Sequence, residues 1–277
     1  MRGKTVVITG ATSGIGEVAA IRLAEAGARI VFTARDQKRA DMTLWKLRQA
    51  NRAADHAVHL ADLSLLSEMK RVADAIASEP AIDVLINNAG ALFNYRRETV
   101  DGLERTFALN HMSYFVVTNI LLPKLKPGAR IVSTASGAHR RAQLDFTDLQ
   151  SRHGYRGFPV YAKSKLCNIL FTRELAKKLE GTGITANCLH PGFVATRFGD
   201  QSGGILSWGV RLAKRFTALS EEEGARTIVY LASSPEVANV NGQYFHECKM
   251  DTPSKAARDD DATKLLWRKS LEIAGLS

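Results

Sequence analysis

Tyr161 and Lys165 are spaced for proton-transfer chemistry. Residues four apart lie on one face of a helix, so the ammonium of Lys165 can lie close to the phenol of Tyr161 and stabilise its phenolate. Such a contact would lower the phenol's pKa, ordinarily about 10, and bring a proton donor toward neutral pH. The pair alone is a weak signal in a chain with 6 tyrosines. It gains weight because it follows a glycine-rich turn, an Asn-Asn-Ala-Gly segment and Ser136, in that order.

The glycine-rich turn stands where a nucleotide phosphate could bind. A short apolar segment at 5–9 leads through Gly-Ala-Thr-Ser-Gly-Ile-Gly directly into a helical pattern, so backbone N–H groups and a helix N-terminus could cradle a pyrophosphate. The alternative is a turn whose glycines only let a helix pack closely on a strand. Because the turn follows the first strand of an alternating pattern, we favour cofactor binding. The residues expected at the phosphates are Gly10, Ser13, Gly14, Ile15 and Gly16.

The end of the second predicted strand bears on which nicotinamide cofactor binds. A carboxylate there accepts hydrogen bonds from the adenosine ribose, whereas a guanidinium can bind the 2′-phosphate of NADP. In this chain Arg35 is the first charged residue after the strand, and the acid, Asp36, comes one place later. This order favours NADP(H), and NAD(H) stays open through Asp36. The alternative interpretation of the basic residues is a solvated helix start.

Asn88, Ala89 and Gly90 follow the fourth predicted strand. Open α/β sheets bind ligands at the carboxyl ends of their strands, so this segment is a candidate part of the same site. Taken alone, it could equally be an Asx turn.

The elements that must position these residues form an alternating pattern of short apolar strands and longer helices. Parallel strands with helical crossovers need both faces of their sheet covered, so we predict an α/β fold: one doubly wound, Rossmann-type domain over 1–277 with a mostly seven-stranded parallel sheet. The predicted strands are 5–9, 29–33, 56–60, 83–87, 130–134 and 184–189, and the predicted helices are 15–26, 38–50, 64–77, 103–125 and 160–179. The pieces expected to be irregular are 137–158, a substrate lid or loop over 192–219, and a charged tail over 253–277.

Composition excludes several other classes of protein. The formal net charge is +10, but no basic stretch is interleaved with aromatic residues as in a nucleic-acid platform, so nucleic-acid binding is disfavoured. The 7 histidines form no His-Glu-x-x-His motif, and we predict no metal. The 3 cysteines lack a Cys-x-x-Cys pair, which fits a reducing compartment. With no apolar run of about 18 residues, we expect a soluble, cytoplasmic protein.

Together these motifs resemble those of the short-chain dehydrogenase/reductase family over almost the whole chain. The resemblance implies a pyrophosphate turn at the glycines named above and an adenine contact at Asp62 and Leu63. The Asn88 to Gly90 segment would support the nucleotide. A Pro-Gly-x-x-x-Thr element that holds the nicotinamide carboxamide would comprise Pro191, Gly192, Val194 and Thr196. The implied catalytic tetrad is Asn110, Ser136, Tyr161 and Lys165.

Within the family, the chain is most similar to the retinol dehydrogenase and carbonyl reductase branch. The similarity rests on the segment 154–173, on His190 in a His-Pro-Gly sequence, and on the 25-residue gap from Ser136 to Tyr161. Most members of that branch prefer NADP(H). The chain departs from the branch at 133–136, where it has Ser-Thr-Ala-Ser in place of Asn-Val-Ser-Ser. Vertebrate retinol dehydrogenases carry a membrane anchor before the first strand. In this chain the first predicted strand begins at residue 5, so we expect a soluble bacterial-style relative.

The resemblance implies a reaction in which NADPH delivers hydride to a carbonyl carbon and Tyr161 protonates the oxygen. Ser136 would hydrogen-bond the carbonyl oxygen, Lys165 would lower the phenol's pKa and bind the nicotinamide ribose, and Asn110 would hold a water in a proton relay. Ser136 as a helix N-cap and Asn110 as an ordinary helix residue are the structural alternatives. Two other functions stay open: reduction of an activated C=C bond, and a dinucleotide-binding sensor without turnover.

The substrate is expected to be a bulky apolar aldehyde, ketone or alcohol. Apolar residues follow the motif strands at Leu92, Phe93 and Phe198 and alternate with basic ones over 205–216. An amphipathic lid helix is favoured for that last segment over a membrane or partner contact, and a weak peripheral membrane contact stays open. Family relatives assemble as dimers or tetramers through the helices that hold Asn110 and Tyr161, and carbonyl-reductase-like members can be monomers.

Overall fold

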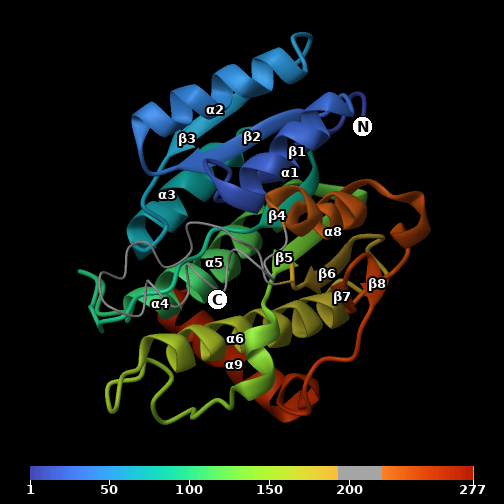
Figure 1. Cartoon of the computed structure of the whole chain (residues 1–277). Helices are drawn as coiled ribbons and strands as arrows, with labels where there is room; N and C mark the ends of the chain where they lie inside the picture. The colour runs from blue at the N-terminus through green and yellow to red at the C-terminus, as the bar shows by residue number, and fades with distance from the viewer. Residues whose placement is uncertain (193–219, 277) are drawn as a thin grey trace.

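The computed structural model describes residues 1–192 and 220–276. Within them the chain forms one sheet of eight strands in the order β3-β2-β1-β4-β5-β6-β7-β8 (Figure 1). β1 to β7 are parallel, and β8 pairs antiparallel with β7 at the edge. This confirms the doubly wound α/β fold, to which the two-residue β8 is an addition that the sequence pattern did not predict. The strands are β1 (Thr5–Ile8), β2 (Arg29–Ala34), β3 (Ala57–Leu60), β4 (Ile82–Asn87), β5 (Leu125–Thr134), β6 (Thr185–Leu189), β7 (Tyr244–His246) and β8 (Lys249–Met250).

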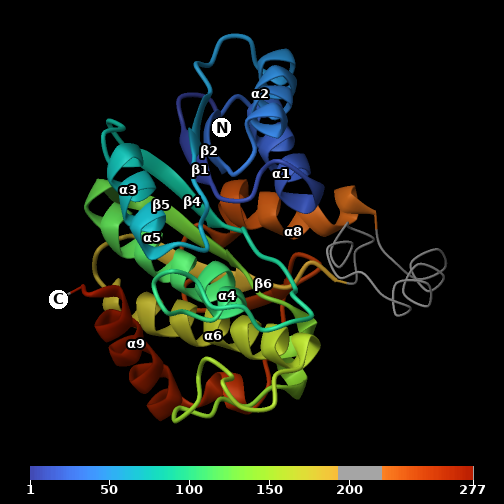
Figure 2. The same cartoon turned by 90° about the vertical axis from the view of Figure 1, so that its left-hand side faces the viewer.

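Helices cover both faces of the sheet, because successive strand residues point to opposite sides. Helices α1, α2 and α8 cover one face, and α3, α5 (Ser113–Leu121), α6 and α9 cover the other (Figure 2). Val6 and Ile8 of β1 belong to the buried cluster on the first face, and Val7 belongs to the cluster on the second. No helix among the described residues combines the length and the apolarity needed to cross a bilayer. The main helices are α1 (Gly14–Glu25), α2 (Gln37–Ala50), α3 (Leu66–Ile76), α6 (Gly157–Lys178), α8 (Glu221–Ser233) and α9 (Asp260–Ala274).

Side-chain caps fix where several helices begin and end. The carboxylate of Asp36 accepts a hydrogen bond from the amide three residues further on and starts α2. Ser220 and Glu223 bond reciprocally to each other's backbone amides, and this capping box starts α8. Asp259 caps α9 in the same way as Asp36 caps α2, and Gly275, with a φ of 58°, ends it in the left-handed conformation.

The single helix predicted over 103–125 is interrupted. Its apolar periodicity continues throughout, but the backbone widens over one turn, and a π-helical turn of this kind takes one more residue than an α-helical turn. Asn110 lies in the middle of that turn and is fully buried. The observed pieces are α4 (Arg105–Phe107), the π turn (Ala108–Met112), α5 (Ser113–Leu121) and a 3₁₀ turn (Leu122–Lys124).

The charged segment expected to be irregular after residue 253 instead forms a short 3₁₀ turn (Ala256–Arg258) and α9. Trp267 of α9 stacks on Phe171 of α6 with a centroid distance of 5.9 Å and meets Phe115 of α5 edge-on at 4.9 Å. The buried positions of α9 recur every three or four residues along one side, which is the spacing of a packed helix face. The abundance of charge on the other side hid this pattern from the sequence analysis.

Candidate active site

The predicted site residues meet at the carboxyl ends of β1, β4 and β5, which are neighbours in the sheet. The glycine-rich turn follows β1, the segment Asn88 to Gly90 follows β4, and Ser136 follows β5 two residues after its end. α6 crosses the same edge and brings Tyr161 and Lys165 to it. The strand order therefore assembles in space four motifs that are spread over 150 residues of sequence.

The glycine turn packs tightly against the end of β4. Gly10 has a φ of 71°, and a Cβ built on it would lie 2.7 Å from the Cα of Ala89. A Cβ on Gly16 would overlap the carbonyl oxygen of Gly10 and the side-chain amide of Asn88. Gly14, with a φ of 59°, opens α1 in the left-handed conformation. Glycine is thus required here by close packing, the alternative considered above, and the same turn leaves the backbone amides at the start of α1 available to an anion.

Asn88 joins the turn to the strands on either side. Its Nδ2 donates to the carbonyl oxygen of Gly10 at 3.0 Å, and its Oδ1 accepts from the hydroxyl of Thr134 at the end of β5 at 3.3 Å. The hydroxyl of Thr9 in turn accepts from the backbone amides of Asn88 and Ala89 at 3.0 and 3.1 Å. These bonds hold the three strand ends in one fixed arrangement, which goes beyond an isolated Asx turn.

Tyr161 and Ser136 are joined by a hydrogen bond between their hydroxyl groups, and Tyr161 is 8% exposed. Burial raises the pKa of Tyr161 to about 12, although the bond to Ser136 pulls it the other way. The sequence analysis expected the ammonium of Lys165 to lower this pKa, and that expectation is wrong for the structure described here. The Nζ of Lys165 lies 5.8 Å from the Tyr161 ring centroid, and desolvation of the phenolate outweighs its influence.

Lys165 is turned toward the end of β5. Its Nζ donates to the carbonyl oxygen of Thr134 at 2.9 Å, and a Cβ on Gly90 would lie 3.3 Å from it. The side chain is 3% exposed, and burial lowers the pKa of Lys165 to about 7. Close to neutral pH the amine can therefore gain or lose a proton, which makes it responsive to any charge brought into the site.

Asn110 acts on the backbone beside the site. Its Oδ1 accepts from the amide of Ala91 and its Nδ2 donates to the carbonyl oxygen of the same residue, both at 2.9 Å. Nδ2 also donates to the hydroxyl of Ser164, which bonds the carbonyl oxygen of Tyr161 at 2.7 Å. The side chain thus clamps the segment after β4 to the helix that carries Tyr161. It is not an ordinary helix residue that bonds its own turn.

Ser136 also serves as the N-cap that was considered as its structural alternative. Its side chain accepts from the amide of Ala138 at 3.2 Å at the start of a short 3₁₀ helix (Gly137–Arg141). The hydroxyl of Ser136 can still donate its hydrogen to Tyr161, so this side chain caps the 3₁₀ helix and bonds Tyr161 at the same time. His139, fully buried, donates to the carbonyl oxygen of Ser136 at 2.7 Å and accepts from the amide of Ser254 at 3.1 Å. The sequence analysis did not identify His139 as a support of this serine.

The adenosine end of the site is more open. Arg35 is exposed directly after β2, and Asp36 is engaged as the cap of α2. Asp62 accepts from the amide and hydroxyl of Ser64 at 3.0 and 2.8 Å in an Asx turn. The side chain of Leu63 is buried in the core, so only its backbone can face a nucleotide.

The segment after β6 is described only in part. Pro191 and Gly192 lie at its start, and the amide of Gly192 donates to the Nδ1 of His190 at 3.2 Å. Val194, Thr196, Phe198 and the rest of the expected lid, 193–219, lie outside the described residues.

An aromatic side chain lies beside Tyr161 in α6. The ring of Phe158, 51% exposed, lies one turn before Tyr161 in α6 at a centroid distance of 6.5 Å. The Tyr155 hydroxyl donates to the carbonyl oxygen of Phe93 at 2.9 Å, and Arg105 lies over the Phe93 ring at 4.3 Å. Phe158 therefore offers an exposed aromatic surface beside the phenol, and Tyr155 anchors the backbone of Phe93. The sequence analysis named Phe93 but not Phe158, although its i, i+3 spacing from Tyr161 could have identified it.

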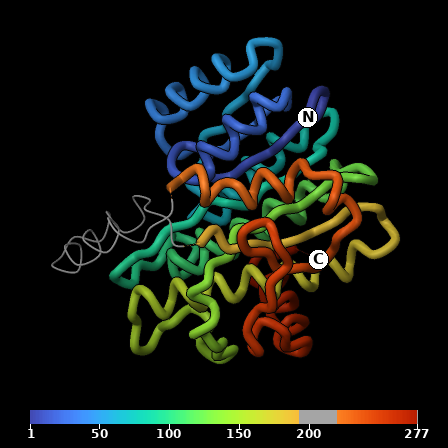
Figure 3. Tube along the Cα trace, turned by 45° about the vertical axis from the view of Figure 1, so that its right-hand side comes forward, coloured from blue at the N-terminus to red at the C-terminus, as the bar shows by residue number. Residues whose placement is uncertain are grey.

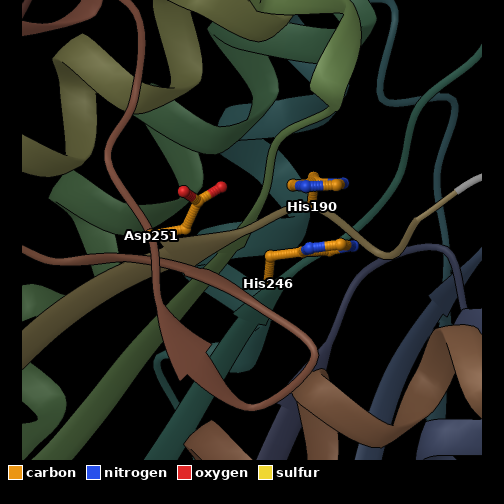
Figure 4. Close-up of side chains that lie close together, drawn as sticks. All are labelled: His190, His246 and Asp251. Atoms are coloured by element: carbon orange, nitrogen blue, oxygen red, sulfur yellow. The ribbon is translucent and has the colours of Figure 1, made fainter.

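Figure 4 shows a cluster of His190, His246 and Asp251 that the sequence analysis did not foresee. The histidines meet because β6 and β7 pair with Leu189 opposite Phe245, which places the next residue of each strand side by side. Their rings stack with a centroid distance of 3.8 Å and an interplanar angle of 11°. Parallel stacked rings direct their nitrogen lone pairs along separate planes, and Asp251 is already bound by Arg140 at 2.7 Å. As arranged, the cluster is an aromatic stack, and burial beside His246 lowers the pKa of His190 to about 4.

Comparisons with known proteins agree with this geometry. The family model of the short chain dehydrogenases matches residues 4–203. The chain is 38% identical to human retinol dehydrogenase 14, over 100% of this chain and 88% of that protein, and 40% identical to the bovine dehydrogenase/reductase SDR family member 13, over 100% and 74%. Among solved structures, an uncharacterised protein from Mycobacterium paratuberculosis is 30% identical, with a TM-score of 0.81 and coverage of 100% and 95%. A short chain dehydrogenase from Burkholderia cenocepacia in complex with NADP is 25% identical, with a TM-score of 0.70 and coverage of 93% and 99%.

Proposed function

Because this chain belongs to the short-chain dehydrogenase family, we propose that it is an NADP(H)-dependent oxidoreductase that interconverts a carbonyl group and an alcohol on a bulky apolar substrate. The observation that carries the proposal is the hydrogen-bonded pair of Ser136 and Tyr161 at the sheet edge where the glycine turn opens α1. A proton donor, a second hydroxyl and a phosphate cradle lie together there, and that is the set of groups that hydride transfer to a carbonyl requires.

A nicotinamide dinucleotide fits the residues present. The turn at Gly10, Gly14 and Gly16 offers backbone amides and a helix N-terminus, and its glycines carry no side chain, which suits a pyrophosphate. When bound, the reduced cofactor supplies the hydride that goes to the carbonyl carbon and is itself oxidised. The electron pair of the C=O bond moves to the oxygen, which takes the proton of Tyr161 and yields the alcohol.

The chain's own residues prepare the proton and hold the oxygen. Burial raises the pKa of Tyr161 to about 12, so the phenol is protonated at neutral pH and holds the proton that a carbonyl oxygen would take. Ser136 can donate to the same oxygen as negative charge develops on it. Lys165, with a pKa of about 7, can supply a proton or a positive charge behind the phenol. Asn110 acts as a positioning residue through Ala91 and Ser164, and a water relay through it stays a proposal.

NADP(H) is proposed over NAD(H) because of the state of the two charged residues after β2. Asp36 already accepts a hydrogen bond from the amide of Arg39 at 2.9 Å, whereas Arg35 is exposed and can bind a phosphate with two parallel hydrogen bonds. The bound NADP in the Burkholderia cenocepacia structure belongs to that protein and is consistent with this preference.

A bulky apolar substrate is proposed because the exposed ring of Phe158 lies beside Tyr161. The names of the relatives, retinol dehydrogenases, describe enzymes for a large apolar alcohol and point the same way. We further propose a cytoplasmic location, where the free cysteines would stay reduced.

The test follows NADPH oxidation at 340 nm with a panel of apolar aldehydes and ketones. We expect turnover that is faster with NADPH than with NADH and that falls by at least about a hundredfold in Tyr161→Phe. Tyr95→Phe is the matched control, since Tyr95 is 73% exposed and should keep full activity. Tight NADPH binding without any carbonyl turnover would refute the proposal and shift attention to C=C reduction or to a sensor. Faster turnover with NADH would refute the role of Arg35.

A further inference from the structure

The outward side of α2 carries two large apolar side chains. Met42 and Trp45 are each 61% exposed, and because they are three residues apart they are neighbours on one helix face. The buried residues of the same helix, Ala40, Thr43 and Leu47, lie on the opposite face and attach it to the domain. Met42 and Trp45 therefore contribute nothing to the packing of α2 on the sheet.

The position of α2 leaves this side accessible along its whole length. α2 runs along the outer edge of the molecule beside the edge strand β3, in each of the views (Figures 1 and 3). A single helix at such an edge presents a convex ridge. Because a convex ridge has no groove to receive a partner's side chains, it is better matched to a flat surface than to a protein anchor.

Cationic side chains surround the two apolar ones. Lys38 lies one turn before Met42 and Arg48 one turn after Trp45, and Arg52 follows in the turn just after α2 ends at Ala50. All three are exposed. The side chain of the acid on this side, Asp41, is bound by Gln37 at 2.7 Å. Lys46, in contrast, turns inward to Glu17 and belongs to the packing of α2 on α1.

The far end of the helix also offers a place for a phosphate group. A surface hollow of about 450 Å³ lies there, lined by Arg48 and Arg52. Its other lining residues are Gln49, Ala53, Ala54 and Asp55. Two guanidinium groups beside a hollow, one helix turn from an exposed tryptophan, combine anion recognition with apolar insertion.

We propose that the α2 outward face, formed by Lys38, Met42, Trp45, Arg48 and Arg52, docks the protein on an anionic phospholipid bilayer. Trp45 and Met42 enter the boundary between headgroups and acyl chains, and the cations face lipid phosphates and carboxylates. The net charge of +10 on the chain draws it toward such a surface from solution. This contact is separate from the lid segment considered above, and it does not depend on the proposed reaction.

The experiment is co-sedimentation of the full chain with vesicles of phosphatidylcholine alone and with about 30 mol % phosphatidylserine. We expect at least about tenfold tighter partitioning to the anionic vesicles, weakened by salt. Met42→Ser with Trp45→Ser, and separately Arg48→Gln with Arg52→Gln, should each lower that partitioning by at least about tenfold. The matched control is Val100→Ser with Met250→Ser, which removes exposed apolar groups elsewhere and should bind as the wild type does.

Two readouts exclude misfolding as the cause. All variants should keep the wild-type melting temperature, since the replaced side chains are exposed, and the α2 variants should bind NADPH as the wild type does. Tryptophan emission should shift to the blue on anionic vesicles in the wild type but not in Trp45→Phe. Equal partitioning of the wild-type protein to anionic and neutral vesicles would overturn the proposal. Binding that survives both α2 double variants would also overturn it, because another surface would then be responsible.

Discussion

Replacing Lys165 by methionine should make the ligand-free protein more stable at pH 6, although Lys165 is part of the proposed active site. In the folded protein the pKa of Lys165 is lowered from 10.5 to about 7 by burial. At a pH between these two pKa values, Lys165 holds a proton in the unfolded chain but not in the folded chain. Wild-type stability therefore rises with pH through this window and is lowest below about pH 7.

The magnitude follows from the same pKa values. At about 1.4 kcal/mol per pKa unit, the penalty reaches a ceiling of about 5 kcal/mol below the folded pKa. Methionine removes the charge, has a similar length and loses one hydrogen bond to the carbonyl oxygen of Thr134, worth about 2 kcal/mol. That oxygen keeps two other donors, from Tyr114 and Asn168, both at 3.4 Å. A net gain of about 2 to 3 kcal/mol is left, or about 4 °C or more in Tm for a domain of this size.

The assay is urea and thermal unfolding of both ligand-free proteins at about pH 6 and about pH 10.5. At the higher pH both proteins are neutral at this position, so the order should reverse and Lys165→Met should be less stable by about 1 kcal/mol. Carbonyl turnover should be lost at either pH. A variant that is equally destabilised at both values would refute the reasoning, because the buried amine would then carry no ionisation penalty. Lys178→Met, on the solvent side of the same helix, should show no such reversal.

Three further substitutions test the positioning of the site. Gly16→Ala should abolish NADPH binding measured by fluorescence, because a Cβ there overlaps backbone; unchanged affinity would contradict the packing argument. Asn110→Ala leaves the amide and carbonyl of Ala91 without their partner, so kcat should fall at least about tenfold. An unchanged kcat in steady-state kinetics would contradict this role of Asn110. Ser270→Ala deprives the buried ring of His111, beside Asn110, of its 2.9 Å hydrogen bond and should cost about 1–3 kcal/mol in urea unfolding, whereas a cost near zero would show that the bond contributes nothing.

The sequence could predict the parts of the fold that depend on local pattern. Apolar β-branched runs predicted β1 to β6 but not β7, and the glycine spacing predicted the tight turn from β1 into α1, because these signals are confined to a few neighbouring residues. β8 escaped prediction because two residues carry no periodicity. The π turn at Asn110 escaped because one extra residue in a helical turn barely disturbs an apolar stripe.

The electrostatics of the site could not be obtained from spacing. Tyr161 and Lys165 lie four apart as predicted, but a pKa depends on how much water the fold removes from each group and on which partner each one meets. In the folded protein Lys165 donates to the carbonyl oxygen of Thr134, and burial sets the direction of the pKa shifts of both Tyr161 and Lys165. The stack of His190 on His246 depends in the same way on the register of β6 with β7, which sequence alone does not set.

The packing of α9 has a consequence for how the protein is made. Phe115 and Phe171 lie in α5 and α6, yet their partner Trp267 belongs to α9, which is synthesised much later. Until α9 has been synthesised, the growing chain exposes the part of α5 and α6 that packs against Trp267. A nascent or prematurely terminated chain that lacks α9 therefore exposes this apolar surface at the stage when chains are most prone to aggregate. The docking of α9, which comes after the strands β1 to β8 in the chain, is therefore the step that covers this apolar surface.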